Sequence, residues 1–385
     1  MTIQERKSIP IPQVEPRLPI PQQNLRVPGP TVLPPEVMAI QASPMINHRG
    51  PEFAAIVKRV SQRLQYFFQT ASPVMTFPAV GTGGQESAIV NLFSPNDHVV
   101  AITIGNFGER IAKIADTYSL NVTRIVFPWG QAADLNVVEE RLKALPPFRG
   151  VIMTHNETST GVTNDVQALS ALVRRISPDA LIVVDAVSSL GSVPLEMDLW
   201  DIDVVFTGSQ KGWMTPPGVM MLAASPRALE ASKTAKLPRF YFDWKSTLKK
   251  LEAWQHPVTS PVSLFYALDV ALEMMLVEGR EAIFERHIQA GQYVRQRAKG
   301  MGLTLFADHE RASNTVTAIM VPEGIEFKAL NKKLRELDHV VIASGQDHMA
   351  GKIFRVGHLG FYTQQDIEQA MNAVETRLHE LGFKG

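Results

Sequence analysis

The sequence contains no cysteine in any of its 385 residues. This absence excludes disulfides, thiolate metal ligands and a cysteine nucleophile, although it fits any redox compartment. Net charge is absent as well, since 38 Lys and Arg residues balance 38 Asp and Glu residues. A chain without net charge has no general attraction to nucleic acid or to an anionic membrane surface. We therefore assign no metal site and expect no nucleic-acid or membrane partner.

Long apolar runs are also missing. Residues 1–7 lack the apolar core of a signal peptide, so we expect a soluble, cytoplasmic protein. Charged residues or glycine interrupt every apolar stretch well short of the roughly 20 residues that a membrane-spanning helix needs. Hydrophobic residues still make up 45% of the chain, which is enough for a large core.

Short apolar runs alternate with helical patterns from about residue 51 onward. This alternation predicts an α/β fold whose mainly parallel sheet has seven strands. The predicted strands cover 74–77, 98–104, 122–127, 150–154, 180–185, 203–207 and 218–223. The predicted helices cover 51–68, 84–94, 107–118, 137–145, 165–176 and 225–234.

Changes in pattern divide the chain into three parts. Residues 1–36 are rich in proline and predict an extended arm, which is either a disordered tail or a segment lying across the body or a partner subunit. Residues 37–262 form the predicted large α/β domain. Residues 263–385 begin with a long helical region, 263–299, and continue as a smaller α+β domain. Its predicted strands are 304–306, 315–320, 340–343 and 353–357, and its predicted helices are 326–337 and 364–381.

A glycine-rich turn follows the first predicted strand. It reads Gly81-Thr82-Gly83-Gly84-Gln85-Glu86-Ser87 and opens a helix. Glycines let the backbone close around an anion, and a helix N-terminus offers unpaired N–H groups, so a phosphate fits here. Such a sequence is often only a turn. A dinucleotide site would need Gly or Ala in place of Glu86, and no Gly-Lys-Ser/Thr of a P-loop is present.

Lys211 and Asp185 stand at the ends of two apolar strands. Lys211 lies among small residues shortly after Val204-Val205-Phe206, and Asp185 closes Leu181-Ile182-Val183-Val184. Pyridoxal 5'-phosphate (PLP) needs such a pair, because a lysine forms a Schiff base with its aldehyde and a carboxylate keeps its pyridine nitrogen protonated. Taken singly, the lysine could be a surface charge, and the carboxylate could be capped by backbone.

Three further residues fit the same hypothesis. Phe107 follows strand 98–104 and could stack on a flat cofactor or simply pack in the core. Thr158, in the polar loop after strand 150–154, could bond a phenolic oxygen or cap the next helix. Arg355, inside an apolar strand, could capture a substrate α-carboxylate or form a structural ion pair. Strand ends of an open α/β sheet meet at one edge, which favours one shared ligand site.

These residues together resemble class V aminotransferases of PLP fold type I, in the alanine/serine–glyoxylate branch. The resemblance extends from about Arg26 to the C-terminus. It rests on Pro28-Gly29-Pro30, His48 to Phe53, Glu157 to Gly161, Asp185 to Ser189, Gly208 to Gly212, Arg355 to Gly360, and Gly345-Gln346-Asp347-His348.

The resemblance implies a role for each matching residue around the cofactor. Lys211 forms the Schiff base and Asp185 pairs with the pyridine nitrogen. The remaining cofactor contacts are Val187 under the ring, Phe107 stacked on it, Thr158 at the phenolic oxygen, and Gly81, Thr82, Gly83 and Gln210 at the phosphate.

The resemblance also implies substrate and subunit contacts. Arg355 binds the substrate carboxylate, and the loop of Gly29 lines the substrate. Thr259 matches a residue that relatives contribute from the partner subunit, which implies a homodimer. Two positions depart from the family: Val80 replaces a serine that many relatives have, and His256 replaces a tyrosine that reaches across the dimer in some.

The implied function is a ping-pong transamination. An amino group moves from alanine or serine to glyoxylate, which gives glycine and a 2-oxo acid. Ureidoglycine–glyoxylate and serine–pyruvate transamination remain alternatives on the same scaffold. A different class of alternative is an interaction subunit associated with a soluble hydrogenase. Cysteine desulfuration and a hydrogenase metal centre are excluded because both need cysteine, which the chain lacks.

Overall fold

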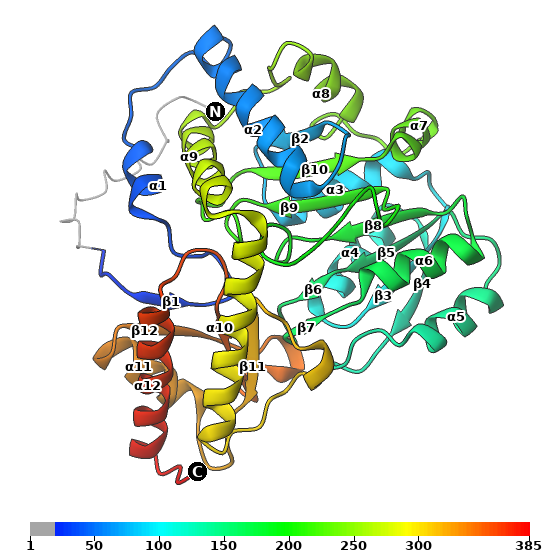
Figure 1. Ribbon diagram of the computed structural model, residues 1–385. Helices are drawn as coiled ribbons and strands as arrows, with labels where there is room; N and C mark the ends of the chain where they lie inside the picture. The colour runs from blue at the N-terminus through cyan, green and yellow to red at the C-terminus, as the bar shows by residue number, and fades with distance from the viewer. Residues whose placement is uncertain (1–19) are drawn as a thin grey trace, which may run out of the picture.

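The computed structural model describes residues 20–385. Most of the proline-rich arm therefore lies outside the described residues. In Figure 1 the chain forms two parts, each built on a sheet, with long helices running between them. We refer to the two sheets as the large sheet and the small sheet. The division into domains at residues 36 and 262 stays a prediction.

The large sheet has seven strands, in the order β2-β10-β9-β8-β5-β3-β4. Neighbouring strands are parallel from β9 to β4, and β10 runs antiparallel to both β9 and β2. This confirms the predicted mainly parallel sheet. The strands are β2 (Val74–Phe77), β3 (His98–Thr103), β4 (Asn121–Val126), β5 (Gly150–Thr154), β8 (Leu181–Asp185), β9 (Val204–Gly208) and β10 (Met220–Ala224).

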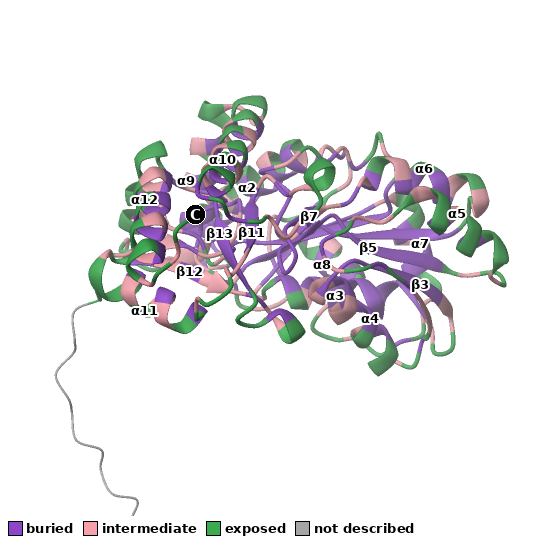
Figure 2. Cartoon of the chain, turned by 90° about the horizontal axis from the view of Figure 1, so that it is seen from below, coloured by how far each residue is buried: buried purple, intermediate pink, exposed green. Residues whose placement is uncertain are grey.

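Helices cover both faces of the large sheet, so its central strands are buried on both sides (Figure 2). Alternate side chains of one strand enter different cores: Ile182 and Val184 join one cluster, and Leu181 and Val183 join the other. The first cluster includes residues of α2 (Pro51–Phe68), α5 (Leu135–Ala144), α6 (Val166–Ile176) and α9 (Val262–Glu278). The second includes residues of α3 (Gly81–Leu92), α4 (Asn106–Thr117), α7 (Pro226–Thr234) and α8 (Trp244–Leu251).

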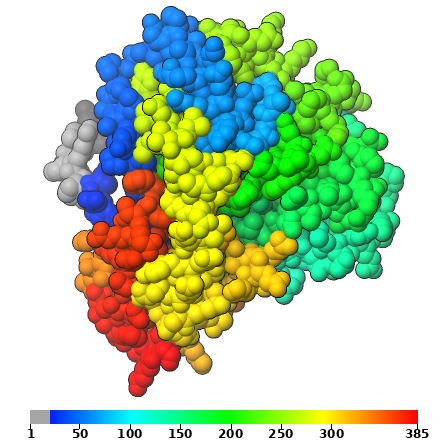
Figure 3. All heavy atoms as spheres, viewed as in Figure 1, coloured from blue at the N-terminus to red at the C-terminus, as the bar shows by residue number. Residues whose placement is uncertain are grey.

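The predicted helical region 263–299 is two helices rather than one. α9 ends at Glu278 and α10 (Arg280–Gly300) begins after Gly279. Gly279 has φ +88°, a left-handed conformation that favours glycine and that an α-helix cannot continue through. In the space-filling view these helices run along the boundary between the two parts of the molecule (Figure 3).

The small sheet has the order β1-β12-β13-β11. Its strands β11 (Val316–Met320), β12 (Val340–Ser344) and β13 (Ile353–Gly357) match the predictions, as do α11 (Phe327–Leu337) and α12 (Gln364–Glu380). The strand predicted at 304–306 is wrong, because only one isolated bridge joins Leu305 to Ile319. No strand was predicted in the arm, yet β1 (Asn24–Arg26) pairs in parallel with β12.

The chain crosses from the small sheet to the large one directly after β1. Thr31 then contacts the backbone beside β9, where its N–H donates to the Gln210 carbonyl at 3.1 Å. α1 (Pro35–Ile40) follows and packs against α9. Within residues 20–385, no helix combines the length and the apolar character needed to cross a membrane.

Candidate active site

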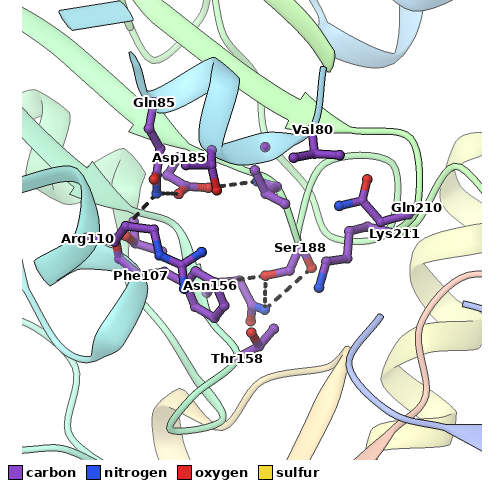
Figure 4. A pocket seen from close by; sticks show the side chains of 14 residues that line it. Val80, Gln85, Phe107, Arg110, Asn156, Thr158, Asp185, Ser188, Gln210 and Lys211 are labelled. Carbon is purple, nitrogen blue, oxygen red and sulfur yellow. Dashed lines mark hydrogen bonds between the residues drawn. The ribbon is translucent and has the colours of Figure 1, made fainter. Parts of the chain in front are cut away.

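A cavity of about 730 Å³, including its open mouth, lies where β5, β8 and β9 end. Figure 4 shows side chains from several of these strand ends and from α3 and α4 pointing into it. Eight residues predicted from the sequence line this cavity: Gly81, Thr82, Phe107, Thr158, Asp185, Val187, Gln210 and Lys211.

One end of the cavity is the N-terminus of α3. Val80 precedes the helix in extended conformation, and no side chain among the described residues caps it. A Cβ atom on Gly81 would lie 2.6 Å from Cγ2 of Val187, so glycine is required for this close approach. Nearby, the buried Oε1 of Gln210 has no hydrogen-bond partner in the described structure. Free backbone N–H groups at a helix N-terminus make this end suitable for a phosphate.

Asp185 closes β8 and is 3% exposed. Its Oδ1 accepts a hydrogen bond from the Val187 N–H at 3.0 Å, and its Oδ2 accepts one from Nε2 of Gln85 at 2.7 Å. Burial raises the pKa of Asp185, while these two bonds and the charges of Lys211 and Arg110 oppose that rise. A buried carboxylate of this kind is stabilised by a cationic N–H such as that of a protonated pyridine.

Lys211 follows β9 and faces the same cavity. Its Nζ donates to the Pro28 carbonyl at 2.5 Å. A Cβ atom on Gly29 would lie 2.6 Å from this Nζ, so the adjacent segment packs directly on the lysine. Burial and, to a smaller extent, the nearby Arg355 guanidinium together lower the pKa of Lys211 to about 8, against the effect of Asp185. A lowered pKa leaves more of the amine neutral and nucleophilic near neutral pH.

Phe107 is held in place by a buried glutamate. Oε2 of Glu157 accepts the N–H groups of Phe107 and Gly108 at 2.9 and 3.1 Å, and its Oε1 accepts the Ser159 hydroxyl at 2.6 Å. The glutamate therefore fixes the first turn of α4, where its negative charge also suits the helix dipole. The Arg110 guanidinium lies 4.7 Å from the centroid of the Phe107 ring.

Arg355 is anchored by main-chain carbonyls on both sides. Its Nε and Nη2 donate to the Ser344 carbonyl at 2.9 and 2.7 Å, and its Nη1 donates to the Thr158 carbonyl at 2.9 Å. No ion pair to Arg355 forms within the described part of the chain, so the structural ion pair weighed from the sequence is not seen. Burial lowers the pKa of Arg355 to about 10. This buried cation, bonded only to neutral groups, suits a carboxylate ligand.

Four predicted residues stand outside the cavity lining: Gly29, Gly83, Thr259 and Arg355. Gly29 contacts Lys211, and Arg355 lies behind Thr158, so both remain adjacent to the cavity. Thr259 is exposed on the surface.

His256, which departs from the family pattern, points into its own chain. Its Nε2 and Nδ1 are 2.7 Å from the hydroxyls of Thr76 and Ser260. Burial lowers its pKa to about 4, so the imidazole is neutral near pH 7. It therefore ties β2 to the segment that carries Thr259.

Several lining residues were not singled out as site residues from the sequence. They include Gln85, Arg110, Asn156 and Ser188. Nδ2 of Asn156 donates to Ser188 Oγ at 2.8 Å and to Thr315 Oγ1 at 3.0 Å. Gln85 lies within the glycine-rich turn and Arg110 follows Phe107 by about one helical turn, so the signal for both was their closeness to a predicted strand end.

Residues 35–369 match the protein-family model described as Aminotransferase class-V. The chain belongs to this family. Class V aminotransferases are PLP-dependent enzymes, and the cofactor of this enzyme is PLP. The unpartnered Oε1 of Gln210, the glycine-lined turn at Gly81, the buried Asp185 and the half-buried Lys211 fit that cofactor.

Relatives of this aminotransferase carry two kinds of name. It is 42% identical to the "Soluble hydrogenase, small subunit" of Synechococcus sp., over 93% of this chain and 94% of the relative. It is 37% identical to the L-aspartate–glyoxylate aminotransferase of Paracoccus denitrificans, over 93% of this chain and 91% of the relative. It is 35% identical to the serine–glyoxylate aminotransferase of Arabidopsis thaliana, over 94% of this chain and 91% of the relative.

Solved structures of similar proteins confirm the fold type I architecture. The alanine–glyoxylate aminotransferase of Nostoc sp. superposes with a TM-score of 0.89 at 31% identity, covering 95% of this chain and 97% of that one. The ureidoglycine–glyoxylate aminotransferase of Bacillus subtilis gives a TM-score of 0.90 at 27% identity, covering 96% and 97%.

Proposed function

We propose that this class V aminotransferase moves the amino group of alanine or serine to glyoxylate, giving glycine and a 2-oxo acid in two half-reactions. The observation that carries the proposal is the placement of Lys211 and Asp185 in one cavity, with Arg355 behind the lining residue Thr158. The names of the Arabidopsis thaliana and Nostoc sp. relatives support the choice of substrates. PLP, when bound, supplies an aldehyde that condenses with amines and a ring that withdraws electrons from the substrate Cα.

Lys211 has two roles in this proposal. Its amine would hold PLP through the aldehyde, and the same amine, once free, would accept and carry the proton of the substrate Cα. Burial and the nearby Arg355 keep its pKa low enough for that shuttle, at about 8. The Pro28 carbonyl accepts a hydrogen bond from Nζ and so orients the amine.

The other residues would position the cofactor relative to the Lys211 amine. Asp185 would keep the pyridine nitrogen protonated, and Val187 and Phe107, which line the same cavity, would contact the ring. Thr158 bonds the phenolic oxygen. Gly81, Thr82, Gly83 and Gln210 hold the phosphate, where the α3 N-terminus favours negative charge.

Arg355 binds the substrate α-carboxylate, and the loop of Gly29 closes over the substrate. A guanidinium matches a carboxylate with two parallel hydrogen bonds, and its bonds to the Thr158 and Ser344 carbonyls hold the fork in place. Both half-reactions use this site, because amino acid and 2-oxo acid substrates share the carboxylate.

A homodimer completes the proposal. Thr259 is exposed on its own chain and is assigned to the partner's phosphate site, as the resemblance implies. Large apolar side chains near the phosphate end support a covered surface there: Phe240 is 95% exposed, Tyr241 41% and Val80 40%. Tyr241 is placed at this end by its hydroxyl, which donates to the Pro78 carbonyl at 3.1 Å. A cytoplasmic location is part of the same proposal.

A substrate panel tests the reaction. The purified enzyme is assayed with alanine, serine, aspartate and ureidoglycine as donors, each against glyoxylate and pyruvate. We expect kcat/KM for alanine or serine with glyoxylate to exceed every other pair by about tenfold or more. A preference for aspartate, ureidoglycine or pyruvate would replace the proposed substrates while leaving the class of reaction in place.

The hydrogenase-subunit names of two relatives at 42% and 41% identity favour one second candidate, a binding role in a larger assembly. The absorption spectrum of the purified protein separates the two. An enzyme of the proposed kind is yellow and loses that colour with alanine or serine, whereas a colourless protein that ignores both amino acids favours the binding role.

A further inference from the structure

Gln85 is a buried cavity residue to which the proposed reaction gives no role. It lies in the first turns of α3 and is 2% exposed. Its Nε2 is 2.7 Å from Oδ2 of Asp185 and 3.4 Å from the Phe107 carbonyl, while its Oε1 has no partner among the described residues. Figure 4 shows the side chain reaching from α3 to Asp185, along the wall of the cavity.

The chemistry of its neighbours fixes which way the Gln85 amide points. An ionised carboxylate and a main-chain carbonyl can only accept hydrogen bonds. The amide nitrogen must therefore face Asp185 and Phe107, and the amide oxygen must face away from them. Gln85 acts here as a donor, and a hydrogen bond to a charged acceptor is stronger than one between neutral groups.

Within residues 20–385, two groups donate to the Asp185 carboxylate: the Val187 N–H and Gln85. The Val187 bond reaches Oδ1 and leaves Oδ2 to Gln85. A carboxylate buried to this degree is costly to ionise unless donors satisfy its oxygens. Removing the Gln85 donor thus destabilises the ionised form of Asp185 and leaves the Asp185 side chain free to rotate.

Helix α3 carries both the phosphate end of the cavity and the Gln85 donor to Asp185. Gly81 begins the helix at the end suited to phosphate, and Gln85 follows four residues later, about 6 Å further along the axis. One rigid helical turn therefore carries both the phosphate cradle and the donor to Asp185. In PLP the phosphate arm is attached to C5, which is meta to the pyridine nitrogen, so one helical turn would carry groups for both contacts.

We propose that Gln85 is a positioning residue that holds Asp185 ionised and aimed at the pyridine nitrogen of PLP. The inference rests on the cofactor and not on the choice of amino donor, so failure of the proposed substrates leaves it standing. The competing role is packing alone, in which Gln85 fills the space between α3 and β8.

The two roles differ in one measurable way. The dissociation constant of the apoprotein is measured for PLP and for 1-deaza-PLP, in which a CH group replaces the ring nitrogen. If Gln85 acts through Asp185, Gln85→Met weakens PLP binding by about tenfold or more, because a donor to a charged group is lost. The same variant changes the affinity for the deaza analogue by less than about twofold, since that ring has no nitrogen for Asp185 to hold.

Glu86→Gln serves as the matched control. Glu86 neighbours Gln85 on α3 but bonds the Tyr118 hydroxyl instead of the cavity. We expect it to leave both affinities within about twofold of the parent. If Gln85→Met lost equal affinity for PLP and for the deaza analogue, Gln85 would have a packing role alone and the proposal would be overturned. An unchanged affinity for PLP would also overturn it. Gln85→Leu gives the same comparison if the methionine variant does not fold.

Discussion

The proposed site has two halves of different construction: the cavity that would hold the cofactor, and the segments beside it that would bind the substrate. The cofactor half is built from α3, α4 and the ends of β5, β8 and β9, which all belong to the large sheet and its helices. The substrate half joins segments far apart in the chain: Pro28-Gly29, Thr158 and Arg355 with Ser344. Sheet topology alone sets the first half, whereas the second depends on how the small sheet and the N-terminal segment lie against the large sheet.

A few hydrogen bonds hold the substrate half together. The Thr31 hydroxyl donates to the Lys211 carbonyl at 3.1 Å. The neighbouring Gly360 is fixed from α10, because Arg286 donates to its carbonyl at 2.9 Å and His287 Nε2 accepts its N–H at 3.2 Å. At the opposite side, Asn106 on α4 donates to the Gln346 side chain at 2.9 Å.

The largest effect is expected in the cofactor half, from Lys211→Ala. Loss of the amine removes both the cofactor's tether and the proton carrier, so we expect kcat to fall by about 10,000-fold. The visible absorption of the cofactor–lysine adduct disappears with it. Substantial turnover in Lys211→Ala would refute the assignment, and Lys233→Ala, a surface lysine paired with Glu230, serves as the control.

The substrate half is tested by Arg355→Met and Arg355→Lys. Loss of the guanidinium should raise KM for amino acid and 2-oxo acid alike by about 100-fold, and the lysine variant should recover part of that because it keeps the charge without the fork. Cofactor affinity should stay within about threefold of the parent, as measured by titrating the apoprotein with PLP. A large loss of cofactor affinity would instead place Arg355 in the cofactor half.

The pH dependence of cofactor capture involves both halves, because Arg355 of the substrate half lowers the pKa of Lys211. Only the neutral amine attacks an aldehyde, and Lys211 has a pKa of about 8, lowered by burial and by Arg355. The rate at which the apoprotein captures PLP should therefore rise about tenfold per pH unit below pH 8 and level off above it. Stopped-flow absorbance measures this rate, and Arg355→Met should move the midpoint upward. A midpoint near that of a solvated lysine would contradict the burial of Lys211.

The sequence predicted the cofactor half well because its logic is local. A strand that ends in a polar or glycine-rich motif can be recognised within a few residues, and parallel strands bring such ends to one edge. Eight predicted residues accordingly line the cavity, including Lys211 and Asp185. Gln85 was missed because a glutamine inside a helix carries no local signal of its partner, which is 100 residues away.

The sequence identified a residue of the substrate half but did not predict which groups that residue contacts. Arg355 was singled out, yet nothing local to it indicated that its donors go to Thr158 and Ser344. The strand β1 was missed for the same reason, since Asn24–Arg26 is short and gains its partner only from β12. The strand expected at 304–306 is wrong for a different reason: Leu305 and Phe306 are apolar and pack against two separate clusters, but a single bridge joins this segment to β11.

The smallest predicted effect concerns the contact between Asn106 and Gln346. Gln346 lies two residues after Ser344, whose carbonyl anchors Arg355, so this contact should keep the arginine in place. Asn106→Ala and Gln346→Ala should each raise KM by about threefold, with kcat and cofactor affinity unchanged. The double variant should be no worse than either alone, because both remove the same hydrogen bond. Additive effects in this cycle would show that the two side chains act separately, and Gln364→Ala on the surface of α12 provides the control.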